Sequence, residues 1–240
     1  MKRLLLVLLG VYLLSFGNSI IAQDLDDILK DYFETGGQDK LLKVNTITMD
    51  GNIMMQGMEF PFTTILKRPN MLRTEFTIQG QKIIRVFDGE NGWMINPMAG
   101  TLEPQDMDPE MVKQLKSQAD MDGELYNYKE KGHEVEYLGT DEMEGTEVHK
   151  IKLTRKDGDV SIYYIDADAY VVLKVTGKRK IQGVEVEGES TLGNYKMVEG
   201  IVFPFSITSG VAGQIGVQIV IDTVLLDKPV ADSLFVRPDK

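Results

Sequence analysis

Residues 65–97, ILKRPNMLRTEFTIQGQKIIRVFDGENGWMINP, decide the fold. From 72 to 78 every second residue is apolar or threonine, and the residues between them are charged or polar. This two-residue period is that of a strand with one buried face. Pro69 interrupts the chain before it, because proline has no amide hydrogen for a neighbouring strand. Glycine-containing turns follow at 79–81 and 88–92. The stretch therefore predicts four short strands joined by tight turns.

The order and spacing of these turns resembles the periplasmic outer-membrane lipoprotein carrier family (LolA-like). The shared pattern is Lys67-Arg68-Pro69-Asn70, then Asp88-Gly89, Trp93 and Asn96-Pro97. A weaker similarity to the family lies near the C-terminus, at Leu234-Phe235-Val236-Arg237-Pro238. Elsewhere the resemblance is one of layout. It implies an incomplete barrel with a hydrophobic cavity and a helical lid.

Further strand patterns lie on both sides of this stretch, at 47–66 and repeatedly from 134 to 226. Asp157-Gly158 is a hairpin turn sequence between two of them. About ten or eleven strands, mostly joined by tight turns, predict one antiparallel sheet. Two or three helices cannot cover both faces of such a sheet, so it must curl. We therefore expect residues 24–240 to form one mainly β, LolA/LolB-like half-barrel domain, with helices capping an apolar cavity.

Helical patterns occur in two regions. Residues 24–35 have an apolar stripe at helical spacing that ends at Gly36-Gly37, and 38–44 can add a short second helix. Residues 98–132 are the one long interval without a strand pattern. Here Asp108 predicts an N-cap and Pro109 the first helical position. A further short helix is expected at 124–129, and this whole interval is the candidate lid.

The first residues have the pattern of an export signal. Lys2-Arg3 is basic, 4–16 is apolar, and a cleavage region lies near Ala22-Gln23. We therefore predict that residues 1–23 are a signal peptide and that 24–240 are exported to the periplasm. An uncleaved anchor is the alternative, although the apolar run is short for a bilayer.

Charge limits the partners of the exported chain. Since Lys2-Arg3 lies in the leader, residues 24–240 keep 24 of the 26 basic residues and all 37 acidic ones, a net charge near −13. Such a surface repels nucleic acid and anionic lipid headgroups. We therefore expect no nucleic-acid partner, and any lipid must be bound by an apolar interior.

No catalytic or metal-binding arrangement is evident. The sequence has no cysteine, which excludes disulfides, thiol nucleophiles and a lipid-modified cysteine. His133 and His149 lie in strand patterns and lack the helical spacing of a zinc pair. The glutamates of 185–189 share a strand face, and cross-strand pairing with basic residues 178–180 explains them better than glycoside hydrolysis. We expect no metal and no cofactor.

Methionine is common in the predicted cavity region. Ten of the thirteen methionines lie between 49 and 121. Methionine adapts to irregular shapes and suits promiscuous apolar sites, although core packing explains any single one. The expected cavity and lid residues are Met49, Met55, Phe60, Phe62, Leu72, Phe76, Trp93, Ile95, Met111 and Leu115.

Arg68 is the residue that the resemblance singles out. It matches the family's motif arginine, which holds the lid closed through hydrogen bonds to the lid backbone. A guanidinium suits this role because it has five donors and keeps its charge. The alternative is a surface ion pair of little energetic weight.

The resemblance implies a non-catalytic carrier that binds the acyl chains of lipoproteins and delivers them toward the outer membrane. It further implies a monomer that meets an inner-membrane release complex and an outer-membrane acceptor. A lipid- or lipoprotein-sensing binding module of the same fold is the alternative. A periplasmic hydrolase ranks last, because no catalytic residues are found.

Overall fold

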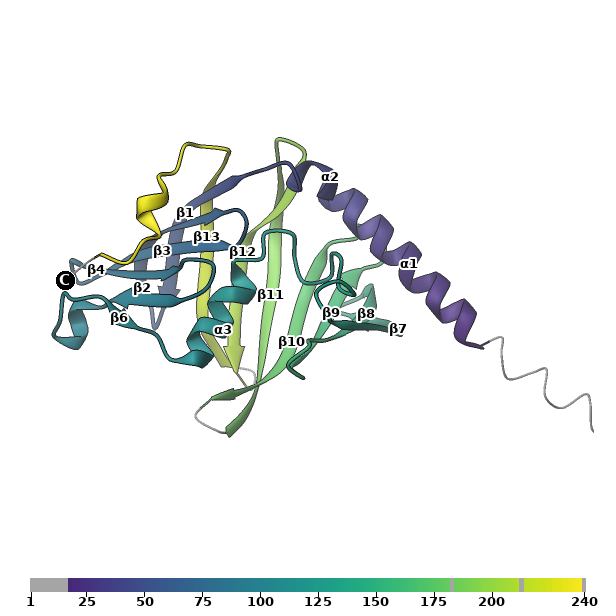
Figure 1. Ribbon diagram of the computed structural model, residues 1–240. Coiled ribbons are helices and arrows are strands. Elements are labelled where there is room, and N and C mark those ends of the chain that lie inside the picture. Colours follow the sequence, from purple (N-terminus) through teal and green to yellow (C-terminus); the bar gives the residue numbers. More distant parts are fainter. Residues whose placement is uncertain (1–16, 182–183, 212–213, 239–240) are drawn as a thin grey trace, which may run out of the picture.

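The computed structural model describes residues 17–181, 184–211 and 214–238 (Figure 1). It contains three α-helices, thirteen strands and two short 3-10 turns within these residues. The helices are α1 (Gly17–Gly36), α2 (Gln38–Leu41) and α3 (Pro109–Gln118), and the 3-10 turns are η1 (Pro97–Ala99) and η2 (Asp232–Leu234). The strands are β1 (Thr46–Met55), β2 (Met58–Lys67), β3 (Met71–Ile78), β4 (Gln81–Phe87), β5 (Gly92–Ile95), β6 (Gln105–Asp106), β7 (Glu134–Met143), β8 (Thr146–Thr154), β9 (Val160–Asp166), β10 (Val172–Ile181), β11 (Val184–Val198), β12 (Ile201–Val211) and β13 (Gln214–Leu226).

All these strands form one antiparallel sheet, in the order β6-β5-β4-β3-β2-β1-β13-β12-β11-β10-β9-β8-β7. The chain runs outward from β1 to β6, crosses to the opposite edge through residues 98–132, and returns from β7 to β13. Strands β6 and β7 therefore form two separate edges, and the sheet is not closed. This confirms the prediction of a single antiparallel sheet that forms an incomplete barrel.

The crossing segment, residues 98–132, is called the lid segment below. Helix α3 starts as predicted, because the Asp108 side chain accepts hydrogen bonds from the backbone amides of Glu110 and Met111. The segment also contains β6, which brings the number of strands to thirteen against the ten or eleven expected. The helix expected at 124–129 is wrong. Turns occupy these residues, and Asn127 has a φ of 49°, a left-handed conformation that interrupts a helix.

Two apolar clusters join the helices to the sheet. The concave cluster combines α3 and other lid residues with β1–β5, β12 and β13. The second cluster combines α1 with β7–β11 and includes Leu125 of the lid segment. In Figure 1, α1 accordingly lies toward the β7–β9 end of the sheet, while α3 contacts β3, β4 and β5. The lid segment therefore packs in both halves of the molecule.

A third cluster lies on the opposite, outer face of the sheet. Val86 belongs to it whereas the adjacent Phe87 belongs to the concave cluster. Because neighbouring side chains in a strand point to opposite faces, the two clusters lie on opposite sides of β4. Phe235 from the C-terminal segment completes the outer cluster and is 1% exposed. The C-terminal segment thus covers the outer face of the sheet at β2–β5.

Candidate functional site

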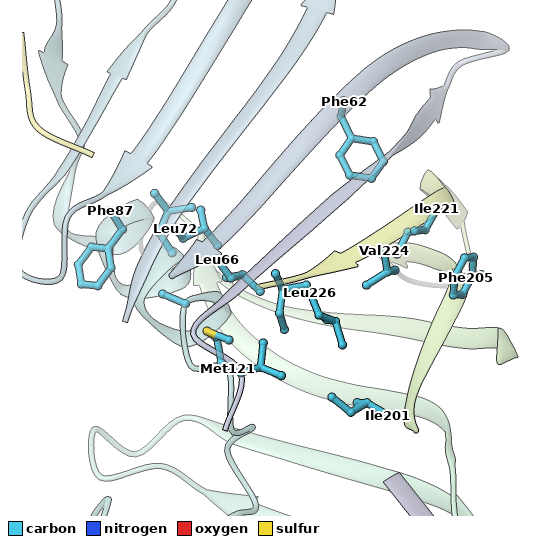
Figure 2. Close-up of a cluster of buried hydrophobic side chains, with 14 of the residues drawn as sticks. Phe62, Leu66, Leu72, Phe87, Met121, Ile201, Phe205, Ile221, Val224 and Leu226 are labelled. Atoms are coloured by element: carbon cyan, nitrogen blue, oxygen red, sulfur yellow. The ribbon is translucent and has the colours of Figure 1, made fainter. Parts of the chain in front are cut away.

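The concave face of the first half of the sheet is apolar and incompletely covered. Figure 2 shows Leu66, Leu226 and Met121 at the centre of its buried cluster. Around them lie apolar side chains that are only partly buried. These are Leu41, Met49, Ile53, Phe76, Met94, Met111, Val112, Val198, Phe203 and Ile219. A surface of this kind suits a ligand with flexible hydrocarbon chains.

Arg68 ties the lid segment to the start of the sheet. Its Nη1 and Nη2 donate to the two carboxylate oxygens of Asp122 at 3.1 and 2.6 Å. Its Nε donates to the carbonyl of Val44 at 2.7 Å, and Nη2 also donates to the carbonyl of Leu41 at 3.0 Å. The side chains of Arg68 and Asp122 are 24% and 23% exposed. This is a bidentate, partly desolvated pair, the stronger form of ion pair.

The contacts of Arg68 differ from those that the resemblance implied. Its lid partner is the carboxylate of Asp122, and its backbone partners precede β1 instead of lying in the lid. The lid backbone is held nearby by another residue, because Gln38 Nε2 donates to the carbonyl of Asp122 at 3.1 Å. Arg68 thus joins lid and sheet, through a different acceptor.

A second anchor lies two residues further along the lid, at Glu124. Glu124 accepts two hydrogen bonds from Arg155, at 2.7 and 2.5 Å. It also accepts from the hydroxyl of Ser117 in α3 at 2.6 Å and from that of Tyr163 in β9 at 3.0 Å. Burial alone raises the pKa of Glu124, but hydrogen bonds from Arg155 and Ser117 hold this pKa below its ordinary value. The carboxylate is therefore charged and joins α3, the lid turn and β9.

Lys113 of α3 adds a third contact, with the carboxylates of Asp157 and Asp159 at 3.0 and 2.5 Å. All three anchors are made by polar side chains at the rim of the lid segment. Beneath it, the packing is apolar. These ion pairs, together with the buried apolar residues Leu115, Ala119 and Met121, hold the part of the lid segment that follows β6 against the sheet.

Comparisons with solved structures identify this architecture. A DUF1329 family protein from Desulfovibrio piger superposes with a TM-score of 0.61 at 12% identity, covering 87% of this chain and 97% of that one. A domain from Vibrio parahaemolyticus, named as an outer membrane lipoprotein-sorting protein, has a TM-score of 0.58 at 9% identity, covering 87% and 97%. A LolA superfamily protein from Nitrosomonas europaea has a TM-score of 0.58 at 9% identity, covering 80% and 90%.

The chain has the LolA fold. These identities are too low to show more than the fold, and no protein-family model and no curated protein matches the sequence. The similarity nevertheless confirms the resemblance that residues 65–97 suggested. It extends the likeness from that stretch to most of the chain.

Within this LolA fold, most of the residues predicted for the cavity lie together. Phe62, Leu72 and Leu115 are buried in the concave cluster, and Met49, Phe76 and Met111 pack against it. Phe60 is buried at 7% exposure, and Met55 is half-buried. Neither of these two belongs to the cluster.

Trp93 and Ile95 lie on the outer face of the sheet and not in the cavity. Both were expected in the cavity, but both belong to the outer cluster with Phe235. Trp93 Nε1 donates to the carbonyl of Phe235 at 3.2 Å. In β5 it is Met94, between them, that faces the concave side. The aromatic signal alone could not assign the face, since both faces of this part of the sheet are covered.

A groove of about 940 Å³, which no sequence pattern indicated, lies beside α1. It lies between α1, α2, the lid turn at 125–130 and the β11–β12 turn. Its lining combines apolar side chains such as Phe33 and Tyr126 with charged ones such as Lys30 and Glu130. These residues are far apart in the sequence, and only the packing of α1 against the lid brings them together.

The histidines and glutamates that were considered for metal binding or hydrolysis make ordinary contacts within the sheet and its turns. Tyr137 Oη lies 3.1 Å from Nδ1 of His149 on a neighbouring strand, and His133 Nδ1 accepts from the amide of Lys156. Glu189 pairs with Lys174 at 2.8 Å. Across residues 17–181, 184–211 and 214–238, no three His, Asp or Glu side chains are placed to hold a metal ion. No helix in these ranges is long and apolar enough to cross a bilayer.

Proposed function

We propose that the protein is a non-catalytic periplasmic carrier, which binds the acyl chains of lipoproteins on its concave face and delivers them toward the outer membrane. The observation that carries this proposal is the row of partly exposed apolar side chains on the concave face, beneath a lid segment that ion pairs and apolar packing hold in place. Acyl chains would cover the apolar side chains that the lid leaves partly exposed. The sorting function named for the Vibrio parahaemolyticus domain supports the same assignment.

The proposed cycle needs two membrane partners. An inner-membrane complex would release the lipoprotein to the open carrier, and an outer-membrane acceptor would take it from the closing one. The carrier acts as a monomer, because one copy provides both the concave face and its lid. Lid opening would be favoured by cargo, since only the open state gives acyl chains access.

Binding of a fluorescent acyl probe tests the proposed site. We expect delipidated protein to bind the probe and phospholipid or acylated peptide to displace it. Ile53→Gln should weaken probe binding about tenfold, because it places an unpaired amide on the concave face. Met54→Gln is the matched control, because Met54 is the adjacent residue, is 40% exposed and points to the opposite face.

Absence of any apolar probe binding to the purified protein would overturn the carrier proposal. Equal effects of Ile53→Gln and Met54→Gln would show that binding takes place elsewhere. Circular dichroism of both variants separates a binding defect from a folding defect.

Export with cleavage near Ala22-Gln23 is part of the proposal. The apolar run at 4–16 lies outside the described residues, and the cleavage region lies within helix α1. N-terminal sequencing of protein from the native envelope should find a start close to Gln23. A start at Met1 in the membrane fraction would contradict it.

A lipid- or lipoprotein-sensing module is the second candidate. The groove beside α1 favours it, because the lid turn at 125–130 lines this groove. A partner segment bound there would sense whether the lid is open or closed. A carrier should transfer lipoprotein from vesicles into soluble complexes. A sensor should bind lipid and leave the lipoprotein in the membrane, so sedimentation of vesicles after incubation distinguishes the two.

A further inference from the structure

Arg85 places a positive charge on the apolar concave face. It lies in β4 two residues before Phe87, a member of the concave cluster, and therefore shares its side of the sheet. Its cross-strand neighbours are Thr74 in β3 and Met94 in β5. Its guanidinium carbon lies 5.1 Å from the centre of the Phe76 ring. Arg85 thus sits among residues proposed to contact acyl chains.

This arginine lacks the partners that such a group needs. Its Nε is the one buried side-chain nitrogen or oxygen in the described ranges that has no hydrogen-bond partner. Within the described residues, the contact with the Phe76 ring is the one hydrogen-bonding, ionic or ring interaction of the Arg85 side chain. Burial lowers the pKa of Arg85, with no carboxylate to offset the effect. Each of the other arginines with a described side chain pairs with a carboxylate: Arg68 with Asp122, Arg73 with Glu75, Arg155 with Glu124 and Arg237 with Asp106.

Arg85 is partly buried, and its Nε is shut off from water without a partner. Removing a charged donor from water without a replacement partner destabilises a folded protein. Methionine would fill the same space at no such cost, and this chain uses methionine freely on the same face. An orphaned buried donor is therefore a sign of a missing acceptor. A carboxylate or phosphate can supply two acceptors in the plane of a guanidinium.

We propose that Arg85 binds the acidic group of an amphiphilic ligand whose acyl chains lie on the concave face. This inference rests on the proposed acyl-binding function and specifies its ligand class. The acidic group is a carboxylate or a phosphate, as in a fatty acid or a phospholipid. The chain as a whole carries a net charge of −11, so its surface repels such ligands. The unpaired cation of Arg85 gives the concave face its preference for them.

Paired ligands that differ only in their acidic group test this proposal. Oleate is compared with methyl oleate, and dioleoylphosphatidylglycerol with dioleoylglycerol, by displacement of a neutral acyl probe. Wild-type protein should prefer at least one acidic ligand over its neutral counterpart by about tenfold or more. The pair that shows the preference identifies carboxylate or phosphate as the source.

Arg85→Met should abolish this preference and leave binding of the neutral ligands within about twofold, because the apolar contacts remain. Arg85→Lys should keep part of it, since an ammonium retains charge but not the planar fork. Lys82→Met is the matched control, because Lys82 is a 59% exposed cation on the same strand that pairs with Glu75 on the outer face.

Equal affinity of wild-type protein for acidic and neutral ligands would overturn the role of Arg85 while leaving the acyl carrier in place. Loss of neutral and acidic ligands together in Arg85→Met would do the same, since it would assign Arg85 to packing. If neither class binds, the proposed function itself fails. Should Arg85→Met not fold, the wild-type preference and its reduction in Arg85→Lys decide the question.

Discussion

Arg68→Leu is expected to open the lid while the sheet stays folded. The substitution removes four hydrogen bonds, two of them to the carboxylate of Asp122. Charge-assisted bonds contribute about 1.5–3 kcal/mol, and both side chains of this pair are mostly shielded from water. The open population should therefore rise about ten- to a hundredfold. Hydrogen exchange of the amides in α3 measures this change directly.

Asp122→Asn tests the contact between Arg68 and the lid separately from the hydrogen bonds that Arg68 donates to the segment before β1. It removes the charge on the lid side but leaves the bonds from Arg68 to Leu41 and Val44 in place. We expect it to reproduce most of the faster exchange in α3. Arg68→Lys should also be impaired, because one ammonium cannot reach these acceptors in the geometry of the guanidinium.

In the proposed carrier cycle, an open lid still admits cargo but does not expel it. Arg68→Leu should thus release lipoprotein from donor vesicles normally and transfer it slowly to acceptor membranes. If Arg68→Leu transfers lipoprotein to acceptor membranes at the wild-type rate, Arg68 has a structural role and none in transfer. Faster exchange in Arg68→Leu with normal exchange in Asp122→Asn would mean that Arg68 acts on the segment before β1 instead of on the lid.

Glu124→Gln is expected to lower the free energy of unfolding by about 3–5 kcal/mol, because Arg155 loses its counter-charge in a site where few waters reach it. The side chains of Glu124 and Arg155 are 13% and 20% exposed. In a domain of this size the melting temperature should fall by about 10 °C. Glu130→Gln is the control, since Glu130 is an exposed glutamate of the same lid segment and should change stability by less than about 0.5 kcal/mol.

The same carboxylate predicts a pH dependence. The folded-state pKa of Glu124 lies below its ordinary value of 4.5. Its stabilisation is therefore fully present above that value and is lost as the pH falls through the lower, folded-state pKa. Wild-type protein should lose more stability on acidification than Glu124→Gln. Parallel unfolding curves for the two proteins between neutral and acidic pH would show that Glu124 is not held as a charged group.

Some of the fold follows from local sequence. The alternation at 72–78 determined both a strand and its buried face, because side chains in a strand alternate and only one set is apolar. Asp108 and Pro109 determined where α3 begins, since capping depends on residues a few positions apart. The motif at Lys67-Arg68-Pro69-Asn70 pointed to the correct fold, which the superposition on the LolA superfamily protein confirms.

Other features depend on contacts between distant segments, which no local pattern contains. The face of Trp93 was decided by Phe235, which lies far along the chain and covers the outer side of β5. The partner of Arg68 is a carboxylate 54 residues away, and its choice depends on how the lid crosses the sheet. The isolation of Arg85 is likewise visible only in three dimensions. A sequence identifies an arginine, but burial and the absence of a nearby acid are properties of the packed chain.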